Sequence, residues 1–263
     1  MADPRTVTVA TDGARIVATI RGSGPAVALI PSLGRGASDF DDLATRLAEA
    51  GYSAAAIDPR NAGESCGGTE NLTLHHYAAD VAAVIRELGG PAHVVGHAFG
   101  NRVARCLATD SPELVSTVTL LAAGGLVEPA PENREALRRC FRYDLPESEH
   151  LAAVRQAFFA EGHDPSVWRD GWWGCVSAAQ SMASRATPVE TWWRGGVAPL
   201  LVIQGLDDVV ARPENGRALR DEMPDRVTLV ELESMGHAML PEQPWAIAHN
   251  LVEFLAQHAP IPT

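Results

Sequence analysis

Residues Gly96 to Gly100 have the composition and spacing of a turn that presents a catalytic nucleophile. The segment reads Gly-His-Ala-Phe-Gly and stands between a short apolar run and a helical pattern. In a Gly-x-Ser-x-Gly turn, the central serine attacks a carbonyl carbon of the substrate. Ala98 occupies the serine position in this chain. The turn is therefore expected without its nucleophile.

His237 is the candidate general base. It follows Gly236 in a segment that is expected to form a loop between a strand and a helix. A histidine there can accept a proton if an acidic side chain fixes its tautomer. Asp208 and Asp207 both follow an apolar run and are the candidates for that acid. The order turn, acid, histidine is one of the orders in which catalytic triads occur along a chain.

The backbone of the turn is expected to keep its function in the absence of the serine. Gly96 and Gly100 leave out side chains where the strand and the helix come close together, and residue 98 is expected in a strained conformation. The Phe99 amide is an unsatisfied donor at the start of a helix. It can therefore donate to a substrate oxygen that gains negative charge.

Eight short apolar runs predict the strands that position these residues. Several are apolar at nearly every position, as expected for strands covered on both faces. The first two are joined by a turn with Asp-Gly, which favours a hairpin, and helical patterns separate the later ones, which indicates parallel crossovers. The sequence predicts an α/β fold with an eight-stranded, mostly parallel sheet flanked by helices. The runs are Thr6–Ala10, Arg15–Ile20, Ala26–Pro31, Ser53–Asp58, Ala92–Gly96, Thr117–Ala122, Pro199–Gln204 and Val227–Leu232.

Helices are expected between these runs. The first is predicted to be capped by Ser38, and the third starts at the turn that contains Ala98. Others are predicted over Thr73–Leu88, Pro213–Met223 and Pro244–Gln257.

The region from Leu126 to Glu190 breaks this alternation. It contains no convincing strand, and prolines interrupt its helical patterns. Five of the six tryptophans lie between Trp168 and Trp193, which is typical either of a packed core or of a lid over a pocket. We expect residues 126–190 to form a helical cap, inserted after the sixth strand into a core made of residues 1–125 and 191–263.

Composition limits the partners of the chain. The formal net charge is -12 and the basic residues are scattered, which disfavours nucleic acid and anionic membranes as partners. No secretory signal or apolar run of membrane-spanning length is evident, so a cytoplasmic location is expected. A small-molecule substrate remains as the expected partner, and a homodimer is left open.

The sequence predicts neither a metal nor a cofactor. No pair of histidines has convincing metal-ligand spacing. Gly34-Arg35-Gly36 lacks the third glycine of a dinucleotide fingerprint, and there is no Walker lysine.

The chain resembles the α/β-hydrolase superfamily, through five segments that occur in the family order. They are VALIPSLGRGASDF, AIDPRNAGES, VVGHAFGNRVA, LLVIQGLDDVVARPENG and ELESMGHAMLPEQP. The second segment departs from the family pattern because Asn61 replaces a glycine. Each segment is a weak signal alone, but all five in order are a strong one.

This resemblance implies roles for several residues. It implies Asp208 as the acid, because the family places that residue three positions after a glycine, here Gly205. It also implies that the Leu33 amide joins the Phe99 amide in an oxyanion hole.

The contacts of the substrate are expected to be largely apolar and aromatic. Apart from Leu33 and Phe99, the residues expected to contact the substrate are Ser32, Trp168, Trp172, Trp173 and Trp192.

Three interpretations of Ala98 follow. In the first, alanine is native and His237 activates water to hydrolyse a small ester, lactone, amide or carbamate, as in the similar aminoacrylate hydrolases, whose turn also carries alanine. In the second, the chain is an inactive Ser-to-Ala variant of a serine hydrolase. In the third, the chain is a cofactor-free lyase or oxygenase, or a non-catalytic ligand-binding member of the fold.

Overall fold

A mostly parallel sheet forms the centre of the molecule. The computed structural model describes residues 3–258. Its long strands lie in the order β1-β2-β4-β3-β6-β7-β8-β9, and the two-residue strand β5 pairs with β2. All pairs from β4 to β9 along this order are parallel, whereas β2 pairs antiparallel with β1 and with β4. The strands are β1 (Arg5–Thr11), β2 (Ala14–Gly22), β3 (Ala26–Ile30), β4 (Ser53–Asp58), β5 (Cys66–Gly67), β6 (Ala92–His97), β7 (Val115–Leu121), β8 (Leu200–Gly205) and β9 (Val227–Leu232).

The predicted fold class is confirmed. The eight predicted runs correspond to the eight long strands, and only the short β5 was not predicted. The central strands β6 and β8 are buried at every position, because helices cover both faces of the sheet. Their mostly apolar sequences, AHVVGH and LLVIQG, suit that double cover.

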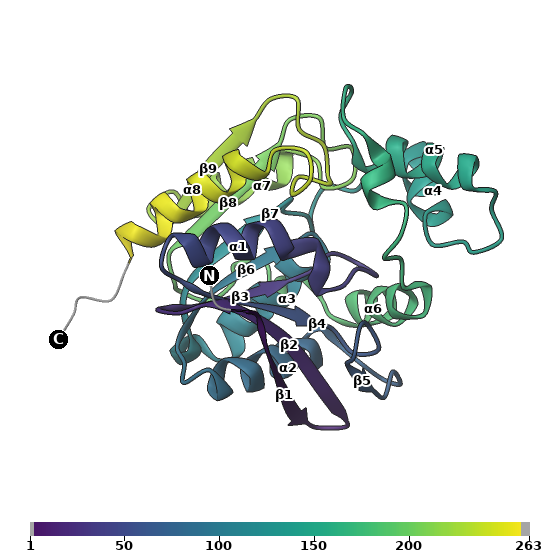
Figure 1. The fold of residues 1–263 in the computed structure, drawn as a ribbon. Coiled ribbons are helices and arrows are strands. Elements are labelled where there is room, and N and C mark those ends of the chain that lie inside the picture. Colours follow the sequence, from purple (N-terminus) through teal and green to yellow (C-terminus); the bar gives the residue numbers. More distant parts are fainter. Residues whose placement is uncertain (1–2, 259–263) are drawn as a thin grey trace.

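Helices pack on both faces of the sheet (Figure 1). One face carries α1 (Asp41–Glu49) and α8 (Pro244–Gln257), and their apolar side chains form one core cluster with the strands. The other carries α2 (Leu74–Glu87), α3 (Phe99–Asp110) and α7 (Glu214–Glu222), which contribute to a second cluster. The sheet is thus the middle layer of three.

The prediction that Ser38 caps the first helix was wrong. A 3-10 turn, Ala37–Phe40, precedes α1, and its N-cap is Gly36. By contrast, Thr73, where the second predicted helix begins, is the N-cap of α2, and its hydroxyl and backbone pair with His76 in a capping box. Further 3-10 turns span Pro112–Leu114, Pro165–Trp168 and Val189–Thr191.

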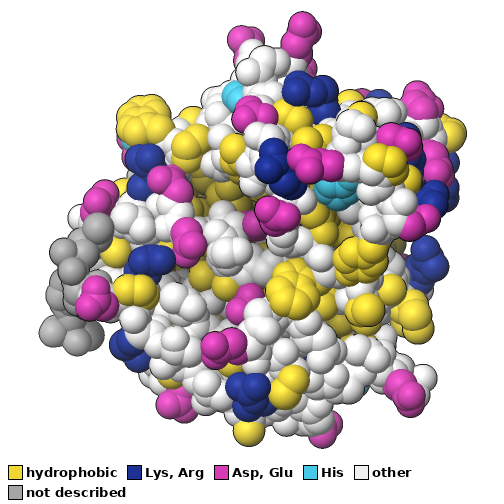
Figure 2. Space-filling model, turned by 45° about the vertical axis from the view of Figure 1, so that its right-hand side comes forward, with side chains coloured by type: hydrophobic (Ala, Val, Ile, Leu, Met, Phe, Trp, Pro, Cys, Tyr) yellow, Lys and Arg dark blue, Asp and Glu magenta, His cyan; other side chains and the backbone are white. Residues whose placement is uncertain are grey.

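Between β7 and β8 the chain forms only helices and loops. These helices are α4 (Pro131–Arg139), α5 (Glu147–Phe158) and α6 (Gly174–Ala186), and residues 126–190 are called the helical segment below. Helices α4 and α5 pack against each other at one side of the molecule, around a small aromatic core that includes Phe158 and Trp168. Figure 2 turns this side forward and shows acidic and basic side chains interspersed over the surface. Within the described residues, no helix has the length and apolar character needed to cross a membrane.

Candidate active site

The turn at Ala98 has the strained geometry that its glycines predict. Strand β6 ends directly before Ala98, which has φ 50° and ψ -103°, and α3 starts directly after it. A Cβ atom on Gly96 would lie 2.3 Å from the carbonyl oxygen of Gly100, and one on Gly100 would lie 2.1 Å from that of Ile30. Only glycine fits at these two positions. The turn therefore keeps its backbone shape although the central residue is alanine.

The structure places Asp208 beside His237, in loops that follow the neighbouring strands β8 and β9. Asp208 Oδ2 lies 2.8 Å from His237 Nδ1, and both side chains are buried. The second carboxylate oxygen accepts hydrogen bonds from the amides of Val210 and Ala211, at 2.8 and 2.7 Å. A carboxylate only accepts, so Nδ1 carries the proton and Nε2 is free to act as a base. Asp207 is exposed and makes no such contact.

The two amides expected at the oxyanion hole lie on the same cavity. Leu33 and Phe99 both line it. Within residues 3–258, neither backbone N–H donates to a protein acceptor, so both remain available to a ligand. The next amide, that of Gly34, donates to Gln180 Oε1 at 2.7 Å, which ties this loop to α6. Ser32 is buried and also lines the cavity.

This cavity has a volume of about 390 Å³ and lies at the carboxyl ends of the central strands. Ala98 and His237 form part of its wall, while Asp208 lies behind His237. The helical segment contributes Trp168 and Trp172, together with Phe141 and Phe158. The structure thus brings nearly all predicted site residues to one cavity.

Trp173 and Trp192 were also expected there, but neither lines this cavity. The Trp173 backbone amide donates to the Gly34 carbonyl, and its side chain is 39% exposed. Trp192 is buried in the core against α3, where the Arg105 guanidinium lies 4.5 Å from the centroid of its ring. The tryptophans of this region therefore differ in direction: Trp172 lines the cavity and the adjacent Trp173 does not. Their spacing in the sequence did not indicate this difference.

The cavity is less apolar than expected, because five arginines line it. One of them, Arg35, lies with its Cζ atom 4.6 Å from the ring centroid of Trp168 and 4.7 Å from that of Trp172, and these two rings pack edge to face. Its guanidinium also bonds both carboxylate oxygens of Asp39, at 2.9 and 2.6 Å. Cation–π contacts of this kind stabilise an aromatic wall. Arg35 thus fixes the two tryptophans that line the cavity.

The other four arginines come from three helices, and sequence reasoning missed all of them. Arg102 lies on α3, Arg134 and Arg138 on α4, and Arg185 on α6. One signal was available for the first, because Arg102 follows Ala98 by four residues and so lies about one helical turn beyond it. The others lie far from the catalytic motifs in sequence. Among residues 3–258, Glu128 is the only acidic residue that lines the cavity.

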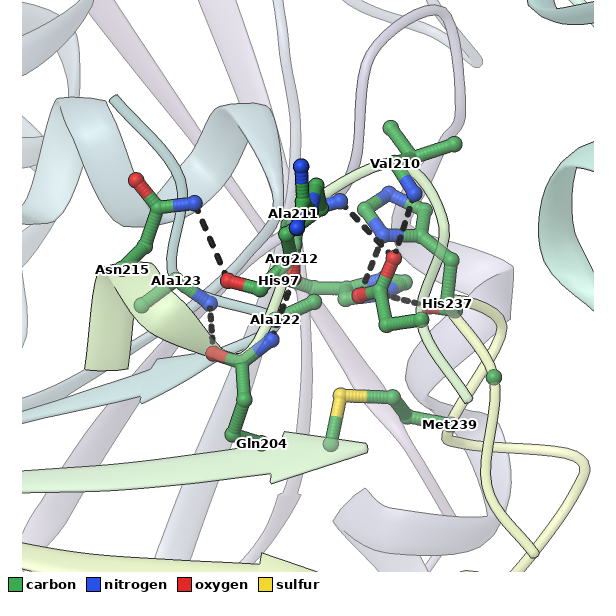
Figure 3. A network of polar contacts seen from close by, with 12 residues as sticks. His97, Ala122, Ala123, Gln204, Val210, Ala211, Arg212, Asn215, His237 and Met239 are labelled. Carbon is green, nitrogen blue, oxygen red and sulfur yellow. Dashed lines mark hydrogen bonds and ion pairs between the residues drawn. The ribbon is translucent and has the colours of Figure 1, made fainter. Parts of the chain in front are cut away.

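Buried polar groups support the turn and the histidine loop. His97 Nε2 donates to the His237 carbonyl at 2.8 Å. Burial lowers the pKa of His97 to about 3, and the neighbouring His237 acts in the same direction, so His97 stays neutral. On β8, Gln204 accepts from the Ala123 amide at 3.1 Å (Figure 3). Such bonds fix the backbone on which the reacting groups stand.

Glu242 holds the histidine loop from the other side. Its buried carboxylate accepts hydrogen bonds from the amides of Gly236, Met239 and Ala160, at 3.1, 2.9 and 2.7 Å. The last of these belongs to the helical segment, so one side chain joins the loop to that segment. In the described part of the chain, no three His, Cys, Asp or Glu side chains are grouped to hold a metal ion.

Comparison with known proteins agrees with this geometry. The profile described as the alpha/beta hydrolase family matches residues 27–248. The chain is 30% identical over 222 residues to BpoC of Mycobacterium tuberculosis, provisionally named a non-heme bromoperoxidase, with 79% of this chain and 84% of BpoC covered. The solved structure of BpoC superposes with a TM-score of 0.78, at 26% identity, over 93% of this chain and 97% of that one.

Two further relatives carry names of hydrolytic enzymes. The rhodomycin D methylesterase DauP of a Streptomyces species is 27% identical over 270 residues, covering 83% of this chain and 85% of DauP. RutD of Variovorax paradoxus, provisionally named a carbamate hydrolase, is 27% identical over 258 residues, covering 89% of this chain and 92% of RutD. The family profile spans most of the chain, and the strand order and turn geometry agree with it. The chain therefore belongs to the α/β hydrolase family and is an enzyme of the hydrolase type.

Proposed function

We propose that this enzyme hydrolyses a small ester, lactone, amide or carbamate with water that His237 activates directly. The observation that carries the proposal is the buried Asp208–His237 pair, which is hydrogen-bonded at 2.8 Å and opens onto the same cavity as Ala98. An alanine there leaves space where a serine hydroxyl would stand. The names of DauP and RutD, a methylesterase and a provisional carbamate hydrolase, support this range of substrates.

The proposed reaction needs one proton acceptor and two amide donors. The water oxygen attacks the carbonyl carbon, and its proton passes to His237 Nε2. The carbonyl electron pair moves to the oxygen, which accepts from the Leu33 and Phe99 amides. When the carbonyl re-forms, the bond to the leaving group breaks. The leaving oxygen or nitrogen then takes the proton from His237, and an acid and an alcohol or amine are released.

Residues 126–190 act as a cap in this proposal. The support is that α4, α6 and the loop carrying Trp168 and Trp172 form the wall of the cavity that faces the strand ends. The cap would keep bulk water from the bound substrate. Ser32, buried beside the Leu33 amide, is proposed to position the attacking water or the substrate oxygen.

A second candidate is a serine hydrolase whose serine has been replaced. The observation that favours it is the retained turn. A residue other than glycine at φ 50° costs energy, and glycine would relieve that cost if no side chain were needed. In this case a serine at position 98 would attack, and His237 would take the proton of its hydroxyl.

The test compares the unchanged chain with Ala98→Ser and His237→Ala on p-nitrophenyl esters and a panel of carbamates. His249→Ala, which changes an exposed histidine on α8, is the matched control. If His237 activates water directly, the unchanged chain should turn over a substrate without a burst. This turnover should be lost in His237→Ala and kept in the other variants. Turnover with an acyl-enzyme burst in Ala98→Ser alone would identify the serine hydrolase. Turnover that survives in His237→Ala would refute both candidates, as would its absence from every variant.

A further inference from the structure

The arginines of the cavity differ from most others in the molecule. All 21 basic residues of the chain are arginine, and nearly every guanidinium bonds an acidic side chain or a carbonyl oxygen. Within residues 3–258, four guanidinium groups have no hydrogen bond or ion pair to the protein. They belong to Arg5, Arg102, Arg134 and Arg185, and the last three line the cavity beside Ala98 and His237. Free positive charge is thus concentrated in the cavity of a protein with a net charge of -12.

Of these three arginines, Arg102 has the charge that most needs a partner. The residues around it exclude water from its guanidinium, and none of them forms an ion pair with it. Burial lowers the pKa of its guanidinium, and the Glu128 carboxylate offsets only part of this effect. Glu128 also lines the cavity, but its carboxylate makes no ion pair with Arg102. The Trp192 ring lies 5.7 Å from Arg102 Cζ and backs the guanidinium on one side. A cation that is largely removed from water and unpaired is costly, so a bound anion would stabilise it.

The helical segment presents polar groups to the same space. On α6, Ser181, Ser184 and Arg185 all line the cavity, and their spacing of three and four residues places them on one face of the helix. On α4, Arg134 lines it one turn before Arg138. Arg138 is already paired with Glu135 at 2.9 Å. Two hydroxyl groups and two free guanidinium groups therefore face the space that Arg102 borders.

We propose that the substrate of this hydrolase carries a carboxylate, and that Arg102 binds it while the scissile carbonyl lies between Ala98 and His237. Arginine presents a planar fork of donors that matches a carboxylate in a bidentate pair. Arg134 and Arg185 add attraction from the cap side of the cavity. Arg102 lies about one helical turn beyond Ala98, so the carboxylate and the scissile bond belong to one small molecule.

A carboxylate fits better than a phosphate. Glu128 shares the cavity and would repel a dianion more strongly than a monoanion. The cavity of about 390 Å³ suits a small organic molecule with one charged end and one uncharged ester, amide or carbamate group. The inference names the substrate class of the proposed function and rests on it.

The test measures binding, so that it does not depend on turnover. Monomethyl succinate has one carboxylate and dimethyl succinate has none, and inorganic phosphate serves as the competing anion. Binding is followed by tryptophan fluorescence, because Trp168 and Trp172 line the cavity. We expect the monoester to bind at least tenfold more tightly than the diester and more tightly than phosphate. In Arg102→Met, the ratio of the affinity for the monoester to that for the diester should fall below threefold. Arg102→Lys should restore part of this advantage of the monoester.

The control variant is Arg155→Met, which removes an exposed arginine of α5 outside the cavity and should keep the full advantage. Circular dichroism checks that each variant is folded. Equal binding of the two esters, no saturable binding of either, or an advantage that survives in Arg102→Met would overturn the proposal. Tighter binding of phosphate would overturn the choice of a carboxylate. If hydrolysis persists in His237→Ala while the carboxylate preference holds, the mechanism fails and the binding site stands.

Discussion

The two walls of the cavity are built in different ways. The wall at the strand ends consists of the turn at Ala98, the loop with Asp208 and the loop with His237, and buried hydrogen bonds fix each of them. Glu242 alone accepts from three amides. The wall from the helical segment is held by aromatic packing around Phe158 and by the contacts of Arg35 with Trp168 and Trp172. It presents long side chains with free ends.

This difference separates chemistry from recognition. Groups that move a proton or hold an oxyanion must stand within a few tenths of an ångström of their positions, which short bonds to buried backbone provide. Groups that select a substrate can be longer and more adaptable. In the proposed function, the first wall therefore defines the reaction class, and the second wall, together with Arg102, defines which small molecule fits.

The largest expected effect tests the strand-end wall through its two neighbouring aspartates. Asp208→Asn should reduce turnover by about 10²–10⁴-fold, because an amide in place of the carboxylate favours the wrong tautomer of His237. Asp207→Asn alters the exposed neighbour and should change turnover less than about threefold. Steady-state kinetics on the best ester of the panel would measure both. Similar losses in the two variants would show that the 2.8 Å contact to His237 is not what matters.

The next effect concerns the side chain that joins the two walls. Glu242→Ala should lower the free energy of unfolding by about 3 kcal/mol, because three buried amides lose a charged acceptor. Urea unfolding followed by circular dichroism would measure it. Glu253→Ala, at an exposed position of α8, should change it by less than about 0.5 kcal/mol. A loss below about 1 kcal/mol in Glu242→Ala would mean that water replaces the carboxylate and that the walls are not joined there.

The strand-end wall was largely predictable from the sequence, because its geometry depends on local chemistry. Two glycines four residues apart are required where the backbones nearly touch. The mostly apolar runs follow from a sheet covered on both faces. Even the departure at Asn61 has a local reason, since it lies at φ 66°, where asparagine is tolerated. Its side chain also bonds both backbone groups of Gly67.

The wall from the helical segment was not predictable in the same way. Trp172 lines the cavity and Trp173 is partly exposed, although they are adjacent, because the loop before α6 turns between them. The free arginines lie on three helices that are far apart in sequence. The position of Arg102 four residues after Ala98 places it near the turn, but nothing local shows that it lacks a partner whereas Arg105 has one. Which arginine finds a partner is decided by tertiary packing, as when Arg105 bonds Asn101 and the Gly124 carbonyl.

A smaller effect is expected at His93, a buried histidine outside both walls, on the pH dependence of the free energy of unfolding. His93 lies at the amino end of β6, bonded to Thr117 Oγ1 at 2.8 Å, and burial lowers its pKa to about 4. Between about pH 4 and 6.5 the unfolded chain binds a proton on His93 that the folded chain does not. The free energy of unfolding therefore falls as the pH falls through this window, by about 1 kcal/mol per pH unit for this group.

His93→Gln should remove the contribution of this group to the pH dependence. The slope of the free energy of unfolding against pH, between pH 5 and 6, should become shallower by about 1 kcal/mol per pH unit. Urea titrations at several pH values would measure the slope. His249→Gln, on the exposed side of α8, should leave it unchanged. An unchanged slope in His93→Gln would indicate that the folded protein opens locally around β6 before this histidine takes up a proton.

The smallest effect compares one alanine from each wall. Ala98 at φ 50° and ψ -103° carries backbone strain of about 1–3 kcal/mol, whereas glycine tolerates this region but costs about 0.5–1 kcal/mol in the entropy of the unfolded chain. Ala98→Gly should therefore raise the free energy of unfolding by about 1 kcal/mol. Ala152→Gly, at an exposed position within α5, should lower it by about 1 kcal/mol, because glycine is a poor helix former. Opposite signs for the same substitution, measured by urea unfolding, would show that the strand-end wall stores strain and the helical wall does not. A loss of stability in both variants would mean that the Ala98 methyl group contributes more to packing than its backbone costs in strain.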